Sequence, residues 1–166
     1  MGALVPRERI EQRILIIRGH RVILDTDLAE LYGVETKAFN RAVTRNMERF
    51  PDDFMFRLTK KEHEDLRYHF GTSRWGGRRY LPYAFTEQGV AMLSSVLRSK
   101  CAIQANIAIM RAFVQLRELI ASNKGLARRL NELEKKYDGQ FRVVFEAIRE
   151  LMAEPAPKSR RIGVKT

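Results

Sequence analysis

The apolar positions of residues 25–46 recur at the spacing of two short α-helices joined by a tight turn. The apolar face of the first helix is formed by Leu28 and Leu31. Asp25 or Thr26 can cap the N-terminal N–H groups of this helix. Gly33 follows it, and glycine tolerates the left-handed conformation that ends a helix. The pattern predicts a helical pair of the helix-turn-helix kind.

The second helix of this pair, over residues 36–46, has two chemically different faces. Thr36 can cap it, and Phe39 and Val43 point toward the core. The outer face has no acid before Glu48 and carries Lys37, Asn40, Arg41, Thr44 and Arg45. In helix-turn-helix proteins the second helix enters the DNA major groove, where Arg and Lys bind guanine or phosphate and Asn binds adenine. An ordinary helical hairpin with a solvated charged face explains this stretch equally well.

Short apolar runs elsewhere predict a small antiparallel sheet. The runs at residues 14–17 and 22–24 flank a turn at residues 18–21, which is a hairpin signal. Alternation predicts a further strand over residues 54–58. Residues 80–85 predict another strand, which we place at an edge of the sheet because it contains Pro82.

Three further helices complete the expected α+β domain. Thr59 and Glu62 have the spacing of a capping box at the start of a helix that continues to about residue 70. Helices are also predicted over residues 86–97 and 100–121. The latter has a broad apolar face that we expect to close the core, and this face includes Ile103, Ile107, Met110, Phe113 and Val114.

From residue 124 the apolar positions change to heptad spacing. They are separated by 4, 3, 4, 4, 3, 4 and 3 residues and comprise Leu126, Leu130, Leu133, Tyr137, Phe141, Val144, Ile148 and Leu151. This pattern predicts a long coiled-coil dimerisation helix, and the alternative is a helix folded back on the domain. The predicted organisation is a DNA-binding domain over residues 1–121, the coiled coil over 122–154 and a basic, disordered tail over 155–166.

The distribution of charge favours a polyanionic partner. The chain of 166 residues has a formal net charge of +11 and a pI near 10.2. Residues 36–80 contain eleven Lys or Arg and six Asp or Glu, and the tail adds four cations and no acid. Residues 122–154 are nearly neutral, with seven cations and six acids. The surplus therefore lies around the predicted DNA-binding helix and in the tail.

A glycine-rich segment at residues 71–79 carries a second group of candidate DNA contacts. It contains three glycines and the side chains Arg74, Trp75, Arg78 and Arg79. A basic, aromatic loop of this kind can grip the DNA backbone or enter the minor groove. The alternative is a solvated hairpin tip with Trp75 folded back on the core.

No catalytic, cofactor or metal site is expected. His63 and His69 are six residues apart on a helix and point in different directions. The acid pairs, Asp25 with Asp27 and Asp52 with Asp53, are explained as cap and turn residues, so a nuclease is disfavoured. The single cysteine, Cys101, and the absence of a long apolar run predict a soluble, cytoplasmic protein without a membrane partner.

Several segments resemble, in order, the phage and prophage KilA-N-type family and more closely its Orf-six N-terminal (ORF6N) branch. They are IRGHRVILDTDLAELYGV, TKAFNRAVTRN, RFPDDFMFRLT, YLPYAFTEQGVAML and EKKYDGQFRVVFEAIRELM. The resemblance implies an α+β DNA-binding domain of the kind found in phage regulators and antirepressors. No second effector domain follows the heptads, unlike in the larger members.

The resulting hypothesis is a dimeric, nucleoid-associated bacterial regulator of transcription that reads the major groove of double-stranded DNA with residues 36–46. The alternative is an antirepressor, or another protein-interaction module, that binds a repressor through the C-terminal heptads and has little affinity for DNA.

Overall fold

An antiparallel sheet organises the residues that the computed structural model describes, which are 10–70, 81–136 and 142–153. The strands are β1 (Leu15–Ile17), β2 (His20–Leu24), β3 (Met55–Arg57), β4 (Tyr83–Thr86) and the short β5 (Arg142–Val143). Their order across the sheet is β3-β4-β2-β1-β5, and each neighbouring pair is antiparallel. The prediction of an α+β fold is confirmed.

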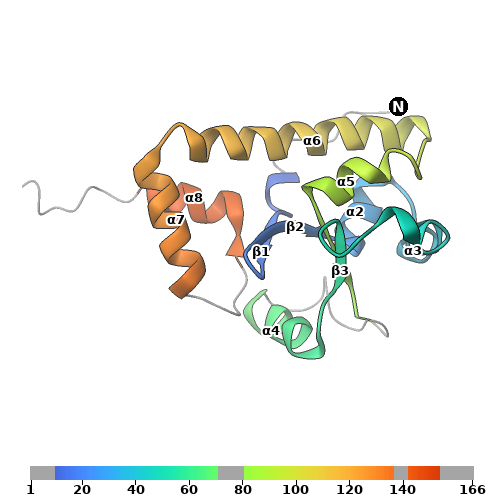
Figure 1. Cartoon of the computed structure of the whole chain (residues 1–166), viewed down its shortest axis with the longest axis horizontal. Coiled ribbons are helices and arrows are strands. Elements are labelled where there is room, and N and C mark those ends of the chain that lie inside the picture. Colours follow the sequence, from blue (N-terminus) through green and yellow to red (C-terminus); the bar gives the residue numbers. More distant parts are fainter. Residues whose placement is uncertain (1–9, 71–80, 137–141, 154–166) are drawn as a thin grey trace, which may run out of the picture.

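Helices cover both faces of this sheet (Figure 1). They are α2 (Asp25–Tyr32), α3 (Thr36–Thr44), α4 (Lys60–Phe70), α5 (Glu87–Leu93), α6 (Lys100–Ala121), α7 (Lys124–Lys136) and α8 (Val144–Ala153), with a short 3-10 helix at Met47–Arg49. The long α6 has the bounds expected from the sequence, whereas α5 ends at Leu93, four residues earlier than expected.

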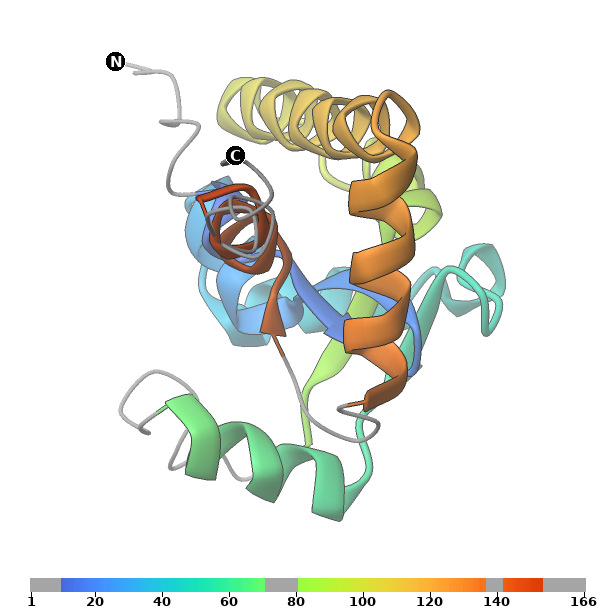
Figure 2. The ribbon, with the colours of Figure 1, turned by 90° about the vertical axis from the view of Figure 1, so that its left-hand side faces the viewer.

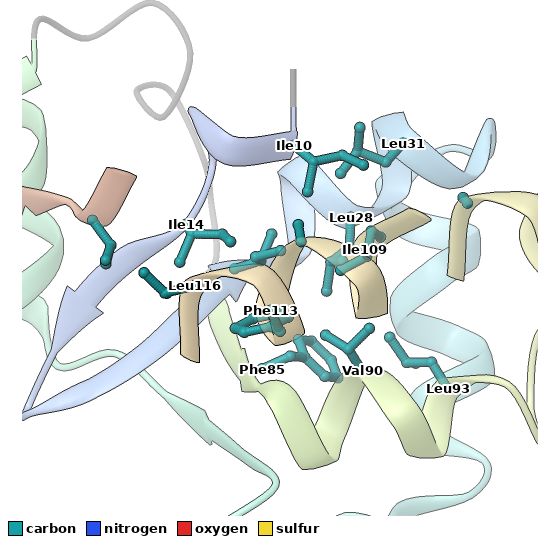
Figure 3. Packing of buried hydrophobic residues seen from close by; sticks show 14 of the residues in the cluster. Ile10, Ile14, Leu28, Leu31, Phe85, Val90, Leu93, Ile109, Phe113 and Leu116 are labelled. Carbon is teal, nitrogen blue, oxygen red and sulfur yellow. The ribbon is translucent and has the colours of Figure 1, made fainter. Parts of the chain in front are cut away.

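Side chains alternate between the two faces of the sheet. Ile23 and Phe85 point into the main core, which the inner side of α6 covers with Ile109, Phe113 and Leu116 (Figure 3). Leu24 and Ala84, their neighbours along the strands, point to the other face and pack with Leu66 of α4. Because both faces are covered, residues 14–17 are continuously apolar instead of alternating.

The β1–β2 hairpin closes with a two-residue turn whose backbone matches the twist of the strands. Arg18 and Gly19 both have positive φ angles, 56° and 77°, as a type I′ turn requires. The guanidinium group of Arg18 binds Glu62 of α4 through two hydrogen bonds of 2.7 and 2.9 Å. It also lies 4.4 Å from the centre of the Phe56 ring. These contacts fix the turn against α4.

The predicted capping box at the start of α4 is confirmed. The backbone N–H of Thr59 donates to Glu62 at 2.7 Å, and the N–H of Glu62 donates to the Thr59 hydroxyl at 3.1 Å. Burial opposes ionisation of Glu62, but the hydrogen bonds from Arg18 and Thr59 outweigh it and lower its pKa.

A lowered pKa makes the stabilisation by Glu62 dependent on pH. The stabilisation is complete above the pKa of the unfolded chain, about 4.3, and is lost as the pH falls through the lower pKa of the folded protein. We expect Glu62→Gln to reduce the free energy of unfolding by about 1 kcal/mol at pH 7. Urea denaturation at about pH 3 should show a smaller difference between the two proteins. An equal difference at both pH values would contradict this linkage.

Strand β4 lies between β3 and β2, so the prediction that it forms a sheet edge is wrong. The strand begins at Tyr83, immediately after Pro82. The carbonyl of Pro82 still accepts a hydrogen bond of 2.9 Å from the N–H of Leu58. A proline lacks only the backbone N–H donor. Because Pro82 precedes the strand, none of the hydrogen bonds between β4 and its neighbours is lost.

The coiled coil is not confirmed, because residues 122–154 do not form one continuous helix. Helix α7 ends at Lys136, β5 follows, and α8 begins at Val144 (Figure 2). The two helices contact each other and the domain. Four of the heptad side chains are buried in the main core of the same chain, namely Leu126, Leu130, Val144 and Ile148, and Leu151 packs against it half-buried. The side chain of Leu133, together with Tyr137, Phe141 and the tail at 155–166, lies outside the described residues.

The structure therefore shows the alternative arrangement, a C-terminal segment folded back on the domain. The main core contains side chains from both sides of residue 121, where the sequence places a domain boundary. The domain boundary at residue 121 stays a prediction.

Gly89 of α5 permits a close approach between this helix and the backbone of Phe54. A methyl group at this position would lie 2.0 Å from the carbonyl oxygen of Phe54. The same carbonyl accepts a hydrogen bond of 3.0 Å from the N–H of Thr86. Thr86 caps α5 by accepting from the N–H of Gly89 at 3.3 Å, and its hydroxyl donates to the carbonyl of Asp53 at 2.8 Å. The start of α5 is thus locked onto the chain that precedes β3.

Candidate nucleic-acid interface

The turn between α2 and α3 has the geometry of a glycine-capped helix end. Gly33 has a φ of 75°, and its N–H donates to the carbonyl of Glu30 at 3.1 Å. The N–H of Val34 donates to the carbonyl of Ala29 at 3.0 Å, which completes a Schellman motif. The predicted end of the first helix at Gly33 is confirmed.

The N-terminal caps of the two helices differ from the prediction. The N-cap residues are Leu24 and Glu35, and neither makes a side-chain capping bond. Strand β2 runs directly into α2, so Asp25 lies one position inside the helix and is fully buried. The expected capping by Asp25, Thr26 or Thr36 is therefore wrong.

Helix α3 is fixed to the domain by its apolar face. Phe39 and Val43 are fully buried. The ring of Phe39 lies 6.0 Å from that of Tyr32 in α2 and 5.5 Å from that of Phe85 in β4, the latter edge to face. Aromatic packing of this kind stabilises one orientation of the helix, because the rings fit only in particular relative positions.

The opposite side of α3 presents three exposed cations in one line. Lys37, Arg41 and Arg45 are spaced four residues apart and all three are exposed. Such spacing places side chains above one another along a helix. Among the described residues, the side chains of these three cations make no hydrogen bond or ion pair. We call Lys37, Arg41 and Arg45 the cationic stripe.

Thr44 lies beside the cationic stripe and is also exposed. Its hydroxyl donates to the backbone carbonyl of Asn40 at 2.7 Å, so one hydrogen-bonding function is used within α3. The oxygen of Thr44 can still accept a bond from outside.

Asn40 turns inward, unlike the other four candidates on α3. Its side-chain amide donates to the Asp25 carboxylate at 3.0 Å, and the same carboxylate oxygen accepts the N–H of Tyr83 at 3.2 Å. The amide oxygen of Asn40 is buried and has no hydrogen-bond partner among the described residues. Asn40 therefore joins α3 to the start of α2 and to β4, and its side chain does not lie on the outer face.

Asp25 is the positioning residue that the sequence pattern does not identify. One sequence feature could have indicated that Asp25 is buried: it directly follows the apolar run of β2, at the point where the strand becomes a helix. The neighbouring acid, Asp27, is also fully buried and binds Arg13, which bonds Glu30 at 2.9 Å as well. Burial lowers the pKa of Arg13, but its carboxylate partners outweigh this effect and the net pKa is raised.

The second group of candidate contacts lies outside the described residues. It comprises Arg74, Trp75, Arg78 and Arg79, within the segment 71–80. The described chain on its C-terminal side enters β4 near the Asp25–Asn40 bond. At this end of β4 the guanidinium group of Arg57 lies 4.4 Å from the centre of the Tyr83 ring.

Two absences concern only the described part of the chain. Within residues 10–70, 81–136 and 142–153, no three His, Cys, Asp or Glu side chains are grouped in a way that could hold a metal ion. In the same ranges no helix has both the length and the apolar character needed to cross a bilayer.

The sheet, the glycine-ended α2 and the anchored α3 define an α+β domain with a helix-turn-helix-like pair. The sequence model of the ORF6N domain matches residues 12–96, which is half of the chain, and the protein belongs to this family. The matched region includes α2, Gly33 and α3. The resemblance found in the sequence is thus confirmed. No curated protein and no solved structure matches the chain.

Proposed function

We propose that this protein is a phage-type regulator of transcription that binds double-stranded DNA by placing α3 in the major groove, without catalysing a reaction. The observation that carries the proposal is the cationic stripe on the outer face of a helix whose other face is buried. The ORF6N membership supports it, because the resemblance to this family implies a DNA-binding domain.

The dimensions of α3 suit this task. The stripe from Lys37 to Arg45 extends about 12 Å along the helix axis at 1.5 Å per residue. A helix with its side chains is about as wide as the major groove. Arg41, at the centre of the stripe, and Arg45 are the candidates for guanine edges, whereas Lys37 and Thr44 suit phosphate oxygens.

The remaining cationic segments would add contacts to the backbone. Residues 71–79 contain three arginines and a tryptophan, and the tail contains four cations without an acid. Such groups contribute affinity that depends on salt and little on sequence. The alternative of an antirepressor acting through the heptads has less support, because the heptad side chains described here are mostly buried in their own chain.

The double variant Arg41→Ala/Arg45→Ala tests the proposal. We expect its affinity for a preferred genomic fragment to fall about 10- to 100-fold, with sequence preference reduced, because two groups able to bind base edges are lost. The measurement is fluorescence anisotropy across a salt series. For the wild-type protein, log affinity should fall linearly with log salt by about 0.9 per neutralised phosphate, and this slope should be smaller for the variant.

A matched control distinguishes the loss of the two α3 side chains from the general loss of two positive charges. Arg128 and Lys135 are exposed cations of α7, away from α3, and Arg128→Ala/Lys135→Ala removes the same net charge. This control should retain the sequence preference and lose no more than about threefold in affinity. Equal losses in both double variants would indicate only a general charge effect. Unchanged binding by the α3 variant would reject α3 as the DNA-reading helix.

A further inference from the structure

Helix α6 carries an apolar line on the side that faces away from the core. Five large hydrophobic side chains are exposed among the described residues, and three of them lie here: Ile103 (48% exposed), Ile107 (43%) and Val114 (37%). Met110 lies between them and is half-buried. We call Ile103, Ile107, Met110 and Val114 the α6 stripe. The expectation that all of these side chains close the core is therefore wrong.

The α6 stripe has the spacing of a helix–helix interface. Its members are separated by 4, 3 and 4 residues, as are the core positions of a coiled coil. An open groove lined by Ile107, Met110 and Val114 runs along this side of the helix. The inner side of α6 is packed against the domain, so the stripe is an additional apolar face (Figure 3).

From this arrangement we infer that a second copy of the chain covers the α6 stripe, with the two α6 helices antiparallel. The spacing 4, 3, 4 is identical when it is reversed. In an antiparallel pair, Ile107 therefore lies opposite the partner's Met110, and Ile103 lies opposite the partner's Val114. All four side chains of each copy meet an apolar side chain of the other.

The charges beyond the α6 stripe favour the same antiparallel arrangement. Lys100 lies three residues before Ile103, and Glu118 lies four residues after Val114, and both are exposed. In this register Lys100 lies across from the partner's position 117, one residue rise, about 1.5 Å, from Glu118. Lys100 and Glu118 are eighteen residues, or five helical turns, apart and so lie on the same side of α6. The antiparallel pair therefore brings Lys100 of each copy near the partner's Glu118. A parallel pair would instead place Lys100 against Lys100 and Glu118 against Glu118, which is repulsive. The neighbouring Arg117 is already paired with Glu87 of its own chain.

Other occupants fit the α6 stripe less well. The tail at 155–166 combines four cations with two prolines and has no apolar side chains at a 4, 3, 4 spacing. A lipid surface would have to accept Arg111 and Glu118 at the borders of a line only one side chain wide. A second α6 meets both the spacing and the charges.

Sedimentation of the full-length protein from about 1 to about 200 µM tests the inferred dimer. We expect a concentration-dependent monomer–dimer equilibrium. Ile107→Lys should raise the dissociation constant at least about 100-fold, because each interface would bury two unpaired ammonium groups. Met152→Lys is the matched control, since Met152 is 60% exposed on α8, outside the stripe, and should not change the equilibrium.

Charge exchange tests the antiparallel register without touching an apolar side chain. Lys100→Glu and Glu118→Lys should each raise the dissociation constant about 5- to 10-fold, and the double exchange should restore it to within about twofold. Each single exchange also places a favourable charge at an end of α6, so neither is expected to destabilise the monomer. Melting temperatures are compared at the lowest protein concentration, where the dimer contributes least to stability. An undiminished melting temperature there, with a weaker dimer at high concentration, reports on the interface.

Three outcomes would overturn the inference. They are a chain that stays monomeric over the whole concentration range, an Ile107→Lys variant that dimerises like the wild type, and a double exchange that does not restore the dimer. None of these outcomes depends on DNA binding, so the inferred dimer and the proposed function can fail separately.

Discussion

Replacing Gly89 by alanine is expected to lower the free energy of unfolding by at least about 4 kcal/mol, beyond the range of most single substitutions. The added methyl group would meet the carbonyl oxygen of Phe54 at 2.0 Å, and this oxygen already accepts a hydrogen bond from Thr86. Backbone would have to move, which would break the connection between α5 and the chain before β3. Denaturation by urea, followed by circular dichroism, measures the change.

Gly125→Ala is the matched control for this prediction. Gly125 also lies in a helix, α7, but a methyl group there would have its nearest neighbour at 3.5 Å, the side chain of Asn123. Alanine favours a helix over glycine by about 1 kcal/mol, so this variant should be as stable as the wild type or more stable. We therefore expect Gly89→Ala to lower the free energy of unfolding and Gly125→Ala to leave it unchanged or raise it. A mild effect at Gly89 would show that α5 is not in close contact with Phe54.

Replacing Asn40 by aspartate is expected to reduce the free energy of unfolding by about 3 kcal/mol or more at pH 7. The substitution is isosteric, but it replaces the amide that donates to the buried Asp25 with a second carboxylate. Two carboxylates at this distance cannot both be ionised without a large cost, so one of them must take up a proton. The loss should therefore be smaller at about pH 5 than at pH 7.

Asn131→Asp provides the control, because Asn131 is an exposed residue of α7. Its effect on stability should be within about 0.5 kcal/mol at either pH. If Asn40 instead acts mainly as a contact to adenine, Asn40→Asp will weaken DNA binding and leave the unfolding transition almost unchanged. Thermal or urea unfolding in the absence of DNA separates these two roles.

Much of the fold follows from local signals in the sequence. The hairpin at Arg18 and Gly19, the capping box at Thr59 and the helix end at Gly33 each depend on residues within a few positions of one another. Such interactions form in the same way wherever the segment lies in the protein, so the pattern predicts them correctly. The position of the cationic stripe on α3 follows from the helical period for the same reason.

The expected N-caps of α2 and α3 are local errors. The other main errors concern interactions between distant parts of the chain. Asn40 is next to the buried Phe39, and the inward direction of its side chain depends on Asp25, fifteen residues earlier. The apolar heptads predict a buried helix face, but they do not specify whether another chain or the same chain covers it. Here α7 and α8 cover the core of their own domain, whereas part of α6 faces outward.

The segment that identifies the family is shorter than the segment needed to complete the hydrophobic core. The ORF6N match ends at residue 96, before α6 begins at Lys100. Yet α6 contributes Ile109, Phe113 and Leu116 to the main core, between the sheet and the other helices. A fragment limited to the matched residues would expose this apolar surface to water and should aggregate. Any protein that shares only the matched segment must therefore supply its own cover for the same surface.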